Sequence, residues 1–322
     1  MKLLVTGANG FLGSWVCKQA LEEGHQVTAL VRNNSDLTEL AGLPIEYVQG
    51  DVTDIESLKK SFKNKDYIFH LAGVVAYKKK DRNLMNKVNI EGTKNVVEVL
   101  KIQQQAKLLH LSSVVAVGAT FEPVIQNENS AYEIDDLDLG YFQTKHLAEK
   151  YVLEAVQNKS IEAICINPST IYGFADAKKG SRKTQVKVAQ GRFPFYTNGG
   201  VNVVAVEDVV ESVFKAIQYG KNGERYIVCS ENLTIQKLFS KIATLADKPV
   251  PSILLPFPIL KLIGHFGDLF NLGISLENAY TASMYHWFSH EKATATWGFQ
   301  PKKSDYAIEN SVRWMHDHGY LK

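Results

Sequence analysis

The sequence predicts an α/β protein with a doubly wound, Rossmann-type parallel sheet and a smaller, mainly helical C-terminal lobe. Three observations predict it. Short apolar runs alternate with helical patterns in the first half of the 322-residue chain, a glycine-rich turn joins the first run to the first helical pattern, and the alternation stops after Pro168. Apolar strand runs separated by helices are typical of parallel sheets covered on both faces.

The elements of the first half follow from these patterns in chain order. We expect strands at 2–6, 26–31, 45–49, 66–71, 107–112 and 161–167. Apolar residues at helical spacing predict helices at 11–22, about 83–104, and 141–156. These elements place a dinucleotide-binding domain at residues 1–170.

The second half has a different rhythm. Glycine and proline interrupt the chain between 173 and 200, and a helix at 206–219 and a strand at 225–229 then restore regular structure. We expect 203–230 to pack back on the first domain. The last part of the chain is predicted to be mostly helical, with turns at Pro251, Pro256 and Gly264. Residues 171–322 are therefore expected to form the substrate-binding lobe.

Composition limits the classes of partner. The hydrophobic share is 45%, the charged share 22% and the formal net charge +2, so no nucleic-acid partner is expected.

The three cysteines, Cys17, Cys165 and Cys229, have apolar neighbours and no metal-ligand spacing. They predict buried thiols in a reducing compartment and no metal site. Gly7 interrupts the first apolar run too early for a signal peptide, so we expect a cytoplasmic protein.

One apolar stretch, 253–263, is long enough to raise the question of a membrane element. It is shorter than the roughly 20 residues that a spanning helix needs, and it contains two prolines and Lys261. No membrane span is expected. Buried core is the favoured interpretation of this stretch, and a membrane-surface role is the alternative.

The glycine turn has the spacing of a phosphate-binding loop. It reads Thr6-Gly7-Ala8-Asn9-Gly10-Phe11-Leu12-Gly13. Glycines there allow a sharp turn, a close backbone approach to a pyrophosphate and tight packing of the helix on the strand. The start of the helix presents N–H groups and a positive dipole end to the phosphates. The loop residues Gly7, Asn9, Gly10, Phe11, Leu12 and Gly13 are the expected contacts. A glycine turn without a ligand is the alternative.

The end of the second strand indicates which dinucleotide binds. An acidic residue at this point would bind the ribose hydroxyls of NAD, but the strand ends in Arg32. A guanidinium suits the 2′-phosphate of NADP. NADP(H) is therefore favoured, and NAD(H) is the alternative cofactor. Arg32 could also be an ordinary surface arginine without a ligand.

Two further turns are expected to touch the cofactor. Asp51 and Val52 follow the third strand, where the carboxylate could accept from adenine and the valine could cover the ring; Asp51 or Asp54 could instead cap a helix. Leu71, Ala72 and Gly73 end the fourth strand, and the last two are small enough for a cofactor to lie close. His70 is interpreted as structural.

The chemistry is expected at Tyr141 and Lys145. Their four-residue separation puts both on one face of a helix. A nearby ammonium would lower the tyrosine pKa from its usual value of about 10 and allow general acid–base catalysis. Ser112 and Ser113 end the fifth strand, where a hydroxyl could hold the same carbonyl oxygen.

Taken together, these motifs resemble the extended short-chain dehydrogenase/reductase family of epimerase/dehydratase type, and most closely its dihydroflavonol-reductase-like branch. The resemblance rests on the glycine loop, the Asp51 turn, His70–Gly73, Asn89-x-x-Gly92-Thr93, the serine pair, Tyr141-x-x-x-Lys145 and Asn167-Pro168. It covers about the first 210 residues. One departure is Thr144, where serine is more usual.

The resemblance implies roles for individual residues. Ser113 is the expected catalytic serine, with Ser112 as its neighbour. Tyr141 is the expected acid/base, and Lys145 is expected to bind the nicotinamide ribose. Pro168 is expected beside the nicotinamide, with Ser169 and Thr170, and Asn89 behind the site as a support. The resemblance also implies a homodimer formed through helices 83–104 and 141–156.

Three functions remain open at this point. The first is an NADP(H)-dependent reductase of a ketone or aldehyde, favoured by Arg32 and by aromatic residues in the expected substrate loop (Phe193, Phe195 and Tyr196), whose alternative role is plain packing. The second is a sugar-nucleotide epimerase or dehydratase with tightly bound NAD, weakly favoured by Arg182, Lys183, Lys187 and Arg192. A dehydratase would need an acidic pair where this chain has Val114-Val115. The third is a non-enzymatic NADP sensor.

Overall fold

The computed structural model describes residues 1–178, 182–270 and 274–321. Its centre is a seven-stranded sheet in the order β11-β7-β5-β4-β1-β2-β3, with all neighbours parallel. The strands are β1 (Lys2–Thr6), β2 (Gln26–Val31), β3 (Glu46–Gln49), β4 (Tyr67–His70), β5 (Lys107–Leu111), β7 (Ala163–Pro168) and β11 (Arg225–Val228). The strand order proceeds outward from β1 in both directions, which is the predicted doubly wound, Rossmann-type arrangement.

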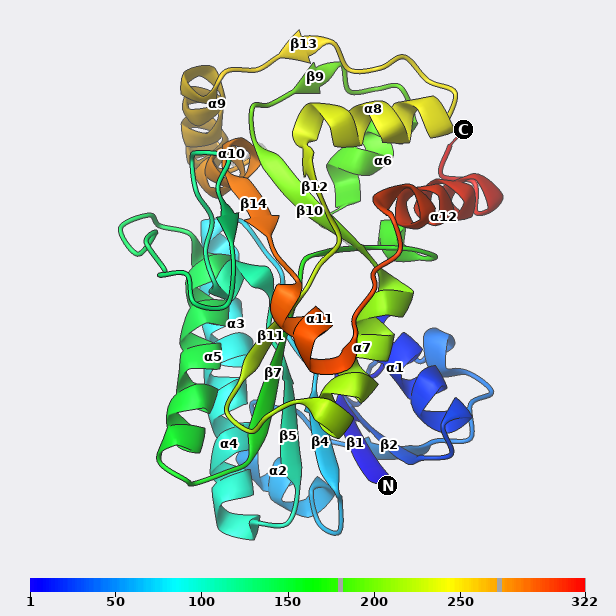
Figure 1. The fold of residues 1–322 in the computed structure, drawn as a ribbon, viewed down its shortest axis with the longest axis vertical. Coiled ribbons are helices and arrows are strands. Elements are labelled where there is room, and N and C mark those ends of the chain that lie inside the picture. Colours follow the sequence, from blue (N-terminus) through cyan, green and yellow to red (C-terminus); the bar gives the residue numbers. More distant parts are fainter. Residues whose placement is uncertain (179–181, 271–273, 322) are drawn as a thin grey trace.

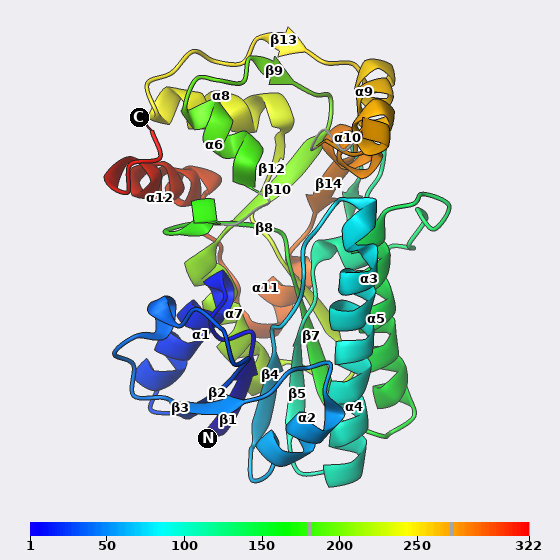
Figure 2. The same cartoon turned by 180° about the vertical axis from the view of Figure 1, so that it is seen from behind.

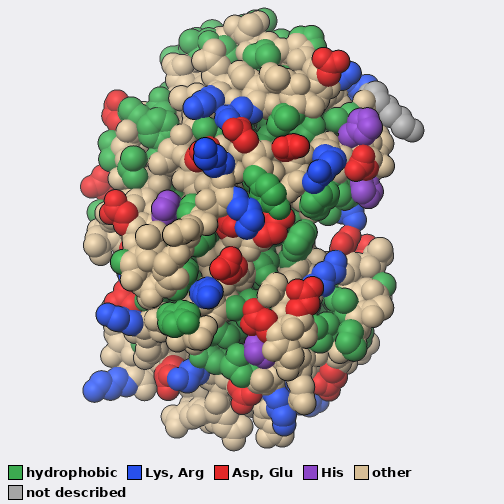
Figure 3. Space-filling view, turned by 45° about the vertical axis from the view of Figure 1, so that its right-hand side comes forward, with side chains coloured by type: hydrophobic (Ala, Val, Ile, Leu, Met, Phe, Trp, Pro, Cys, Tyr) green, Lys and Arg blue, Asp and Glu red, His purple; other side chains and the backbone are tan. Residues whose placement is uncertain are grey.

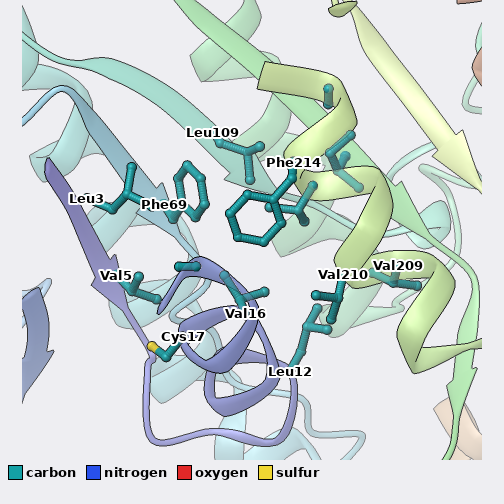
Figure 4. Close-up of a cluster of buried hydrophobic side chains, with 14 of the residues drawn as sticks. Leu3, Val5, Leu12, Val16, Cys17, Phe69, Leu109, Val209, Val210 and Phe214 are labelled. Carbon is teal, nitrogen blue, oxygen red and sulfur yellow. The ribbon is translucent and has the colours of Figure 1, made fainter. Parts of the chain in front are cut away.

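Helices cover both faces of this sheet (Figures 1 and 2). One face carries α1 (Phe11–Glu22) and α7 (Val206–Tyr219), and the other carries α2 (Ile55–Ser61), α4 (Gly92–Gln103) and α5 (Gly140–Gln157). Figure 4 shows why α7 belongs to the first face. Its Val209, Val210 and Phe214 pack with Val16 of α1 and Phe69 of β4 in one buried cluster.

The predicted helix at 83–104 is divided into three segments. A short α3 (Arg82–Met85) continues into a π-helical turn at Asn86–Glu91, and α4 then begins at Gly92. The π-turn coincides with Asn89, whose side chain bonds both the N–H and the carbonyl of Val74. Helical spacing alone does not reveal this wider turn, because the flanking apolar pattern is unchanged.

The lobe above the main sheet contains a second sheet that the sequence did not predict. Its order is β12-β10-β14-β6, and β8 pairs with β10. The strands are β6 (Ile125–Gln126), β8 (Thr170–Tyr172), β10 (Gly200–Ala205), β12 (Glu231–Thr234) and β14 (Tyr285–Phe288), and a separate pair is formed by β9 (Phe195–Tyr196) and β13 (Ile253–Leu254). Around them lie α6 (Lys183–Ala189), α8 (Ile235–Leu245), α9 (Phe257–Phe270), α10 (Leu276–Ser283), α11 (Glu291–Trp297) and α12 (Ser304–Asp317). Short 3₁₀ turns occur at Thr38–Leu40, Lys79–Asp81, Val114–Ala116 and Asp176–Lys178.

Two expectations about the apolar stretch near α9 are wrong. Gly264 lies inside α9 and not at a turn, because it and Gly267 let α9 pack backbone-to-backbone on the segment before α10; a Cβ on Gly267 would lie 2.1 Å from the carbonyl oxygen of Ile274. The stretch is also not buried core, since Ile259 and Leu262 are 51% and 57% exposed. Among the described residues, no helix is long and apolar enough to cross a membrane.

Two compositional features are visible in the folded molecule. The three cysteines are buried and unpaired, and burial raises the pKa of the Cys17 thiol to about 12. On the face drawn in Figure 3, basic and acidic side chains are intermixed.

Candidate active site

The predicted site residues lie at one edge of the main sheet. Strands β1, β4, β5 and β7 are parallel neighbours, so their carboxyl ends meet at that edge. The register pairs Thr6 with His70 and His70 with His110. Gly7, Ala72 and Ser113 follow the ends of three of these strands. In open α/β sheets this edge is where ligands bind.

The glycine loop is packed backbone against backbone. Gly7 has a φ of 70°, and a Cβ there would lie 2.8 Å from the amide nitrogen of Ala72. A Cβ on Gly13 would lie 2.1 Å from the carbonyl oxygen of Gly7. Helix α1 begins after Gly10 with no side-chain cap and no acidic residue in its first turn. A cradle of this shape at a positive helix end fits a pyrophosphate.

The remaining loop residues support the loop from its sides. Asn9 donates from Nδ2 to the carbonyl of Asp36, 3.1 Å away, which ties the loop to the turn after β2. Leu12 is buried in the main core, and Phe11 packs against that core. The cofactor contacts expected for these residues remain predictions.

A cavity of about 660 Å³ opens beside the ends of β2 and β3, and Arg32 and Asp51 contribute to its lining. Asp51 accepts hydrogen bonds from the amide and hydroxyl of Thr53, while Asp54 caps α2. The helix cap is therefore Asp54, and the contact of Asp51 with adenine stays a prediction. Val52 is buried beneath α4, where a Cβ on Gly92 would touch its side chain.

His70 is held in a buried polar chain. Its Nδ1 lies 2.8 Å from the Thr6 hydroxyl and its Nε2 lies 3.0 Å from the Thr93 hydroxyl. Burial lowers the pKa of His70 to about 3, and the Lys145 charge adds to this effect. A buried ring whose two nitrogens both contact threonine hydroxyls supports the β1–β4 edge, which agrees with its structural interpretation.

Ser113, Tyr141 and Lys145 converge at the ends of β5 and α5. A hydrogen bond joins the Tyr141 phenol to Ser113, and Lys145 Nζ donates to the carbonyl of Leu111 at 2.8 Å. Burial raises the pKa of Tyr141 to about 12, and the Ser113 bond opposes it. Burial lowers the pKa of Lys145 to about 8, opposed by Glu149 and Cys165. The sequence predicted a lowered tyrosine pKa, whereas in this structure burial raises it. The role of Tyr141 as the acid/base stays a prediction.

Two amide side chains brace this group. Asn89 donates from Nδ2 to the Thr144 hydroxyl at 3.1 Å, and that hydroxyl donates to the carbonyl of Tyr141 at 3.0 Å. Thr144, the departure from the usual serine, therefore still provides a bridging hydroxyl. Asn167 donates to the carbonyl of Ser113 at 3.0 Å. Asn89 thus lies behind the site, as the resemblance implied.

The other predicted residues lie at the rim of the same edge. Ser112 is buried, and within the described residues its hydroxyl has no hydrogen-bond partner. Pro168 ends β7, and Thr170 begins β8, which pairs with β10 of the upper sheet. The Ser169 hydroxyl donates to the side chain of Asn202, 2.7 Å away. These residues therefore connect the two sheets next to the site.

Sequence reasoning missed two residues beside Tyr141. The Tyr77 ring meets the Tyr141 ring edge-on at 6.1 Å between centroids. Glu277 of α10 accepts a hydrogen bond from the backbone N–H of Tyr141 at 3.1 Å, across 136 residues of sequence. Tyr77 follows the fourth strand closely enough to have been considered. Glu277 gave no local signal, since its contact depends on the folding of the C-terminal lobe.

Chemically, the site combines a protonated phenol, a second hydroxyl on the same side, a buried ammonium and a phosphate cradle. This set can hold a dinucleotide and pass a proton to a carbonyl oxygen.

Known proteins match this chain over the residues that form this site and beyond them. Residues 3–229 match the model of the NAD dependent epimerase/dehydratase family. A Synechocystis sp. protein provisionally named dihydroflavonol 4-reductase is 28% identical, with 99% of this chain and 95% of the relative covered. Sterol demethylase protein B of Methylococcus capsulatus is 30% identical, covering 83% and 81%. The 2-alkyl-3-oxoalkanoate reductase of Stenotrophomonas maltophilia is 25% identical, covering 97% and 98%.

Solved structures share the whole architecture. The crystal structure of gox2253 has a TM-score of 0.89 and 30% identity, with 99% of each chain covered. That of PA4631, a nucleoside-diphosphate-sugar epimerase from Pseudomonas aeruginosa, has a TM-score of 0.82 at 19% identity, covering 100% of this chain and 99% of that one, and shares the fold. The chain therefore belongs to the NAD dependent epimerase/dehydratase family, that is, the extended short-chain dehydrogenases/reductases, and is an NAD(P)-dependent oxidoreductase.

Proposed function

We propose that the protein is an NADP(H)-dependent reductase of a ketone or aldehyde, with Ser113, Tyr141 and Lys145 as its catalytic residues. The observation that carries the proposal is the convergence of these three side chains at the sheet edge that also carries the glycine cradle. The bound dinucleotide supplies the hydride. Tyr141, protonated at neutral pH, donates its proton to the carbonyl oxygen, and the Ser113 hydroxyl holds that oxygen in place. Lys145 binds the nicotinamide ribose.

The preference for NADP(H) rests on the end of β2. Arg32 is exposed at the cavity beside β2 and β3, where its guanidinium can pair with a 2′-phosphate. Asp36, the nearest acid along the chain, is bonded to Thr38, which lowers the pKa of its carboxyl. Arg32 is the cation in the lining of this cavity, which also contains Asp51 and Asp54.

The surroundings of Tyr141 support a lipophilic substrate. Tyr141 packs against a buried apolar cluster that includes Leu139, as do the partly buried Val115, Tyr132 and Tyr280. Relatives named for dihydroflavonol, sterol and 2-alkyl-3-oxoalkanoate chemistry agree with an apolar or aromatic carbonyl compound. Of the aromatic residues in the expected substrate loop, Phe193 packs on Phe239 of α8, so packing accounts for it.

A sugar-nucleotide substrate is the second candidate, because structural neighbours include UDP-sugar epimerases. The site has fewer groups that could bind a sugar nucleotide or act on it. Arg182, one of the cations that could meet a diphosphate, is 4% exposed; it donates to the carbonyl of Ile171 and lies 3.6 Å from the buried Asp176. Buried Val114 and partly buried Val115 also stand where a dehydratase needs acids.

We further propose a boundary near residue 170 between a dinucleotide-binding domain and a substrate lobe, with residues 203–230 packing back on the first domain.

We also propose a homodimer formed through α4 and α5. Leu147 on α5 is 47% exposed and Ile102 on α4 is 67% exposed, which leaves apolar side chains available on both helices. Light scattering in solution measures the dimer directly: a monomeric mass contradicts it.

The test of function starts with the nucleotide that copurifies. Exchangeable NADPH supports the reductase, and tightly held NAD supports the epimerase. NADPH consumption is then measured with a panel of apolar ketones and aldehydes.

We expect Tyr141→Phe to lose turnover by at least about a hundredfold while NADPH affinity is retained, since only the proton donor is removed. Equal turnover in the variant refutes the assigned acid, and a wild-type protein that binds NADPH without turnover supports the sensor.

A further inference from the structure

The helix that carries the catalytic tyrosine lacks a cap of its own. Its N-cap residue is Leu139, which makes no side-chain capping bond. The helix begins at Gly140 and Tyr141 follows, so both N–H groups belong to those that an α-helix leaves without an internal acceptor. Serine, threonine, aspartate or asparagine usually supplies that acceptor. The first turn of α5 therefore needs one from elsewhere in the molecule.

Glu277 supplies it from the other lobe. It lies in the first turn of α10, which sits beyond the upper end of α5 (Figures 1 and 2). Its Oε1 accepts from the N–H of Tyr141 at 3.1 Å, and the carboxylate also accepts from the N–H of Gly140. Only 6% of Glu277 is exposed. A charged acceptor at a helix N-terminus forms a stronger bond than a neutral one.

The groups around Glu277 leave its charge partly uncompensated. Arg82 Nη2 is 3.9 Å from Glu277 Oε2, but Arg82 is bonded more closely to Asp138, at 2.6 Å from Nη1. Lys79 lies 3.9 Å from the same aspartate. Two phenols also face this region, those of Tyr77 and Tyr132.

Burial raises the pKa of Glu277 to about 7. The N–H groups of Tyr141 and Gly140 and the Arg82 charge oppose this increase, and Asp138 adds to it. The carboxyl group therefore changes charge within the neutral pH range.

We propose that Glu277 is a positioning residue of the active site, whose carboxylate holds the first turn of α5 and thereby fixes where Tyr141 presents its phenol. The proposal rests on the assignment of Tyr141 as the proton donor. Ser113 is set independently, by β5 and by Asn167. Loss of the acceptor frees the N–H groups of α5 and lets the phenol move relative to the serine. Because misplacement of a reacting group slows the chemical step, the effect falls on kcat and not on nucleotide binding.

The proposal predicts a pH dependence with opposite signs for activity and stability. As the pH falls through about 7, the carboxyl group takes up a proton and becomes a weaker acceptor, so kcat falls. The pKa in the folded state lies above the ordinary glutamate value of 4.5, so the folded state binds this proton more tightly than the unfolded chain does. This group therefore adds stability as the pH falls from about 7 toward 4.5. In acid, kcat therefore falls while this group makes the folded state more stable.

The experiment compares Glu277→Gln with a matched control, Glu231→Gln, in the full-length protein. Glu231 Oε2 accepts from the N–H of Ser304 at 3.2 Å in the first turn of α12, whose N-cap Lys303 likewise makes no side-chain capping bond. The control thus removes the same charge from the same kind of cap, on a helix that does not carry Tyr141. The readouts are kcat, the KM for NADPH, the pH profile and the melting temperature.

We expect Glu277→Gln to lower kcat about tenfold above pH 7 with an unchanged KM for NADPH. The pH profile of kcat for this variant should lack the fall near pH 7, called here the limb. At every pH its kcat should match the value that the wild-type protein has below pH 7. Glu231→Gln should keep both kcat and the limb. An unaltered kcat in Glu277→Gln, a limb that persists, or an equal loss of kcat in the control overturns the proposal.

A separate readout keeps this inference distinct from the proposed function. If the wild type turns over no carbonyl compound, the proposed function fails, and hydrogen exchange at the amides of Gly140 and Tyr141 decides the inference. Faster exchange in Glu277→Gln at an unchanged melting temperature supports the cap. Equal exchange overturns it.

Discussion

Arg32 is the single residue on which the choice of dinucleotide depends. It stands at the end of β2, exposed beside the cavity between β2 and β3. An aspartate at this place would accept from ribose hydroxyls and repel a 2′-phosphate. We expect Arg32→Asp to weaken NADPH binding by roughly 10- to 100-fold, since a charge-assisted pair is lost and a repulsion is gained. NADH binding should be retained or improved.

Titration of both nucleotides against wild type and variant measures this change. Lys18→Asp makes the same charge reversal elsewhere on the surface, and it controls for a general electrostatic effect. Equal NADPH affinity in Arg32→Asp would show that Arg32 does not read the phosphate.

The residues that could be predicted from the sequence are those whose signal is local. Gly7, Gly13 and Tyr141 stand in motifs of a few residues, and each lies at the expected end of a strand or helix. The electrostatics of Tyr141 could not be predicted in the same way. Its pKa depends on burial and on the Ser113 bond, and both arise from packing between elements that are distant in sequence.

At the scale of elements, α5 is anchored to the edge of the sheet by a buried carboxylate. Glu149 is 2% exposed, accepts from Arg225 Nη1 of β11 at 3.0 Å and also accepts from Asn167 of β7. Removing one partner of a buried ion pair leaves the other charge uncompensated. We expect Glu149→Ala to lower the free energy of unfolding by about 3–5 kcal/mol.

Urea denaturation of the variant tests this anchor. Glu154→Ala, at an exposed position on the same helix, should change the stability by less than about 0.5 kcal/mol. A stability loss in Glu149→Ala no greater than in Glu154→Ala would show that the carboxylate is not an anchor.

Strands with continuous apolar runs, such as β1 and β7, could be predicted, whereas the strands of the upper sheet could not. Strand β10 reads Gly-Val-Asn-Val-Val-Ala and is buried along its whole length, yet its polar Asn202 breaks the apolar run. That side chain is satisfied by Ser169, Ser230 and Asn232 from other segments. Asn202 can therefore be buried because a hydrogen-bond network satisfies it, and the sequence around β10 does not reveal that network.

At the scale of the whole molecule, the chain passes repeatedly between the two lobes. Strand β6, from the first half, pairs with β14 in the upper sheet, while β11, from the second half, completes the main sheet. Arg225 Nε donates to the carbonyl of Glu128, and the Glu128 carboxylate accepts from the N–H of Ile227. The nucleotide-binding sheet therefore depends on segments that follow residue 170.

This interleaving predicts that fragment 1–170 does not fold by itself. It lacks α7, and Figure 4 shows that Val209, Val210 and Phe214 of this helix fill one face of the core. It also lacks β11. Fragment 1–230 restores both elements and should recover helical circular dichroism and weak NADPH binding. A cooperative melting transition in fragment 1–170 would contradict the dependence.

The same interleaving predicts one unfolding transition for the full-length chain. If the lobes fold together, a ligand bound at the glycine loop stabilises both, by about 2.7 kcal/mol at a concentration 100 times its Kd. Calorimetry should then show a single peak that NADPH moves upward as a whole. Two peaks, of which NADPH moves only one, would mean that the lobes unfold independently despite the shared strands.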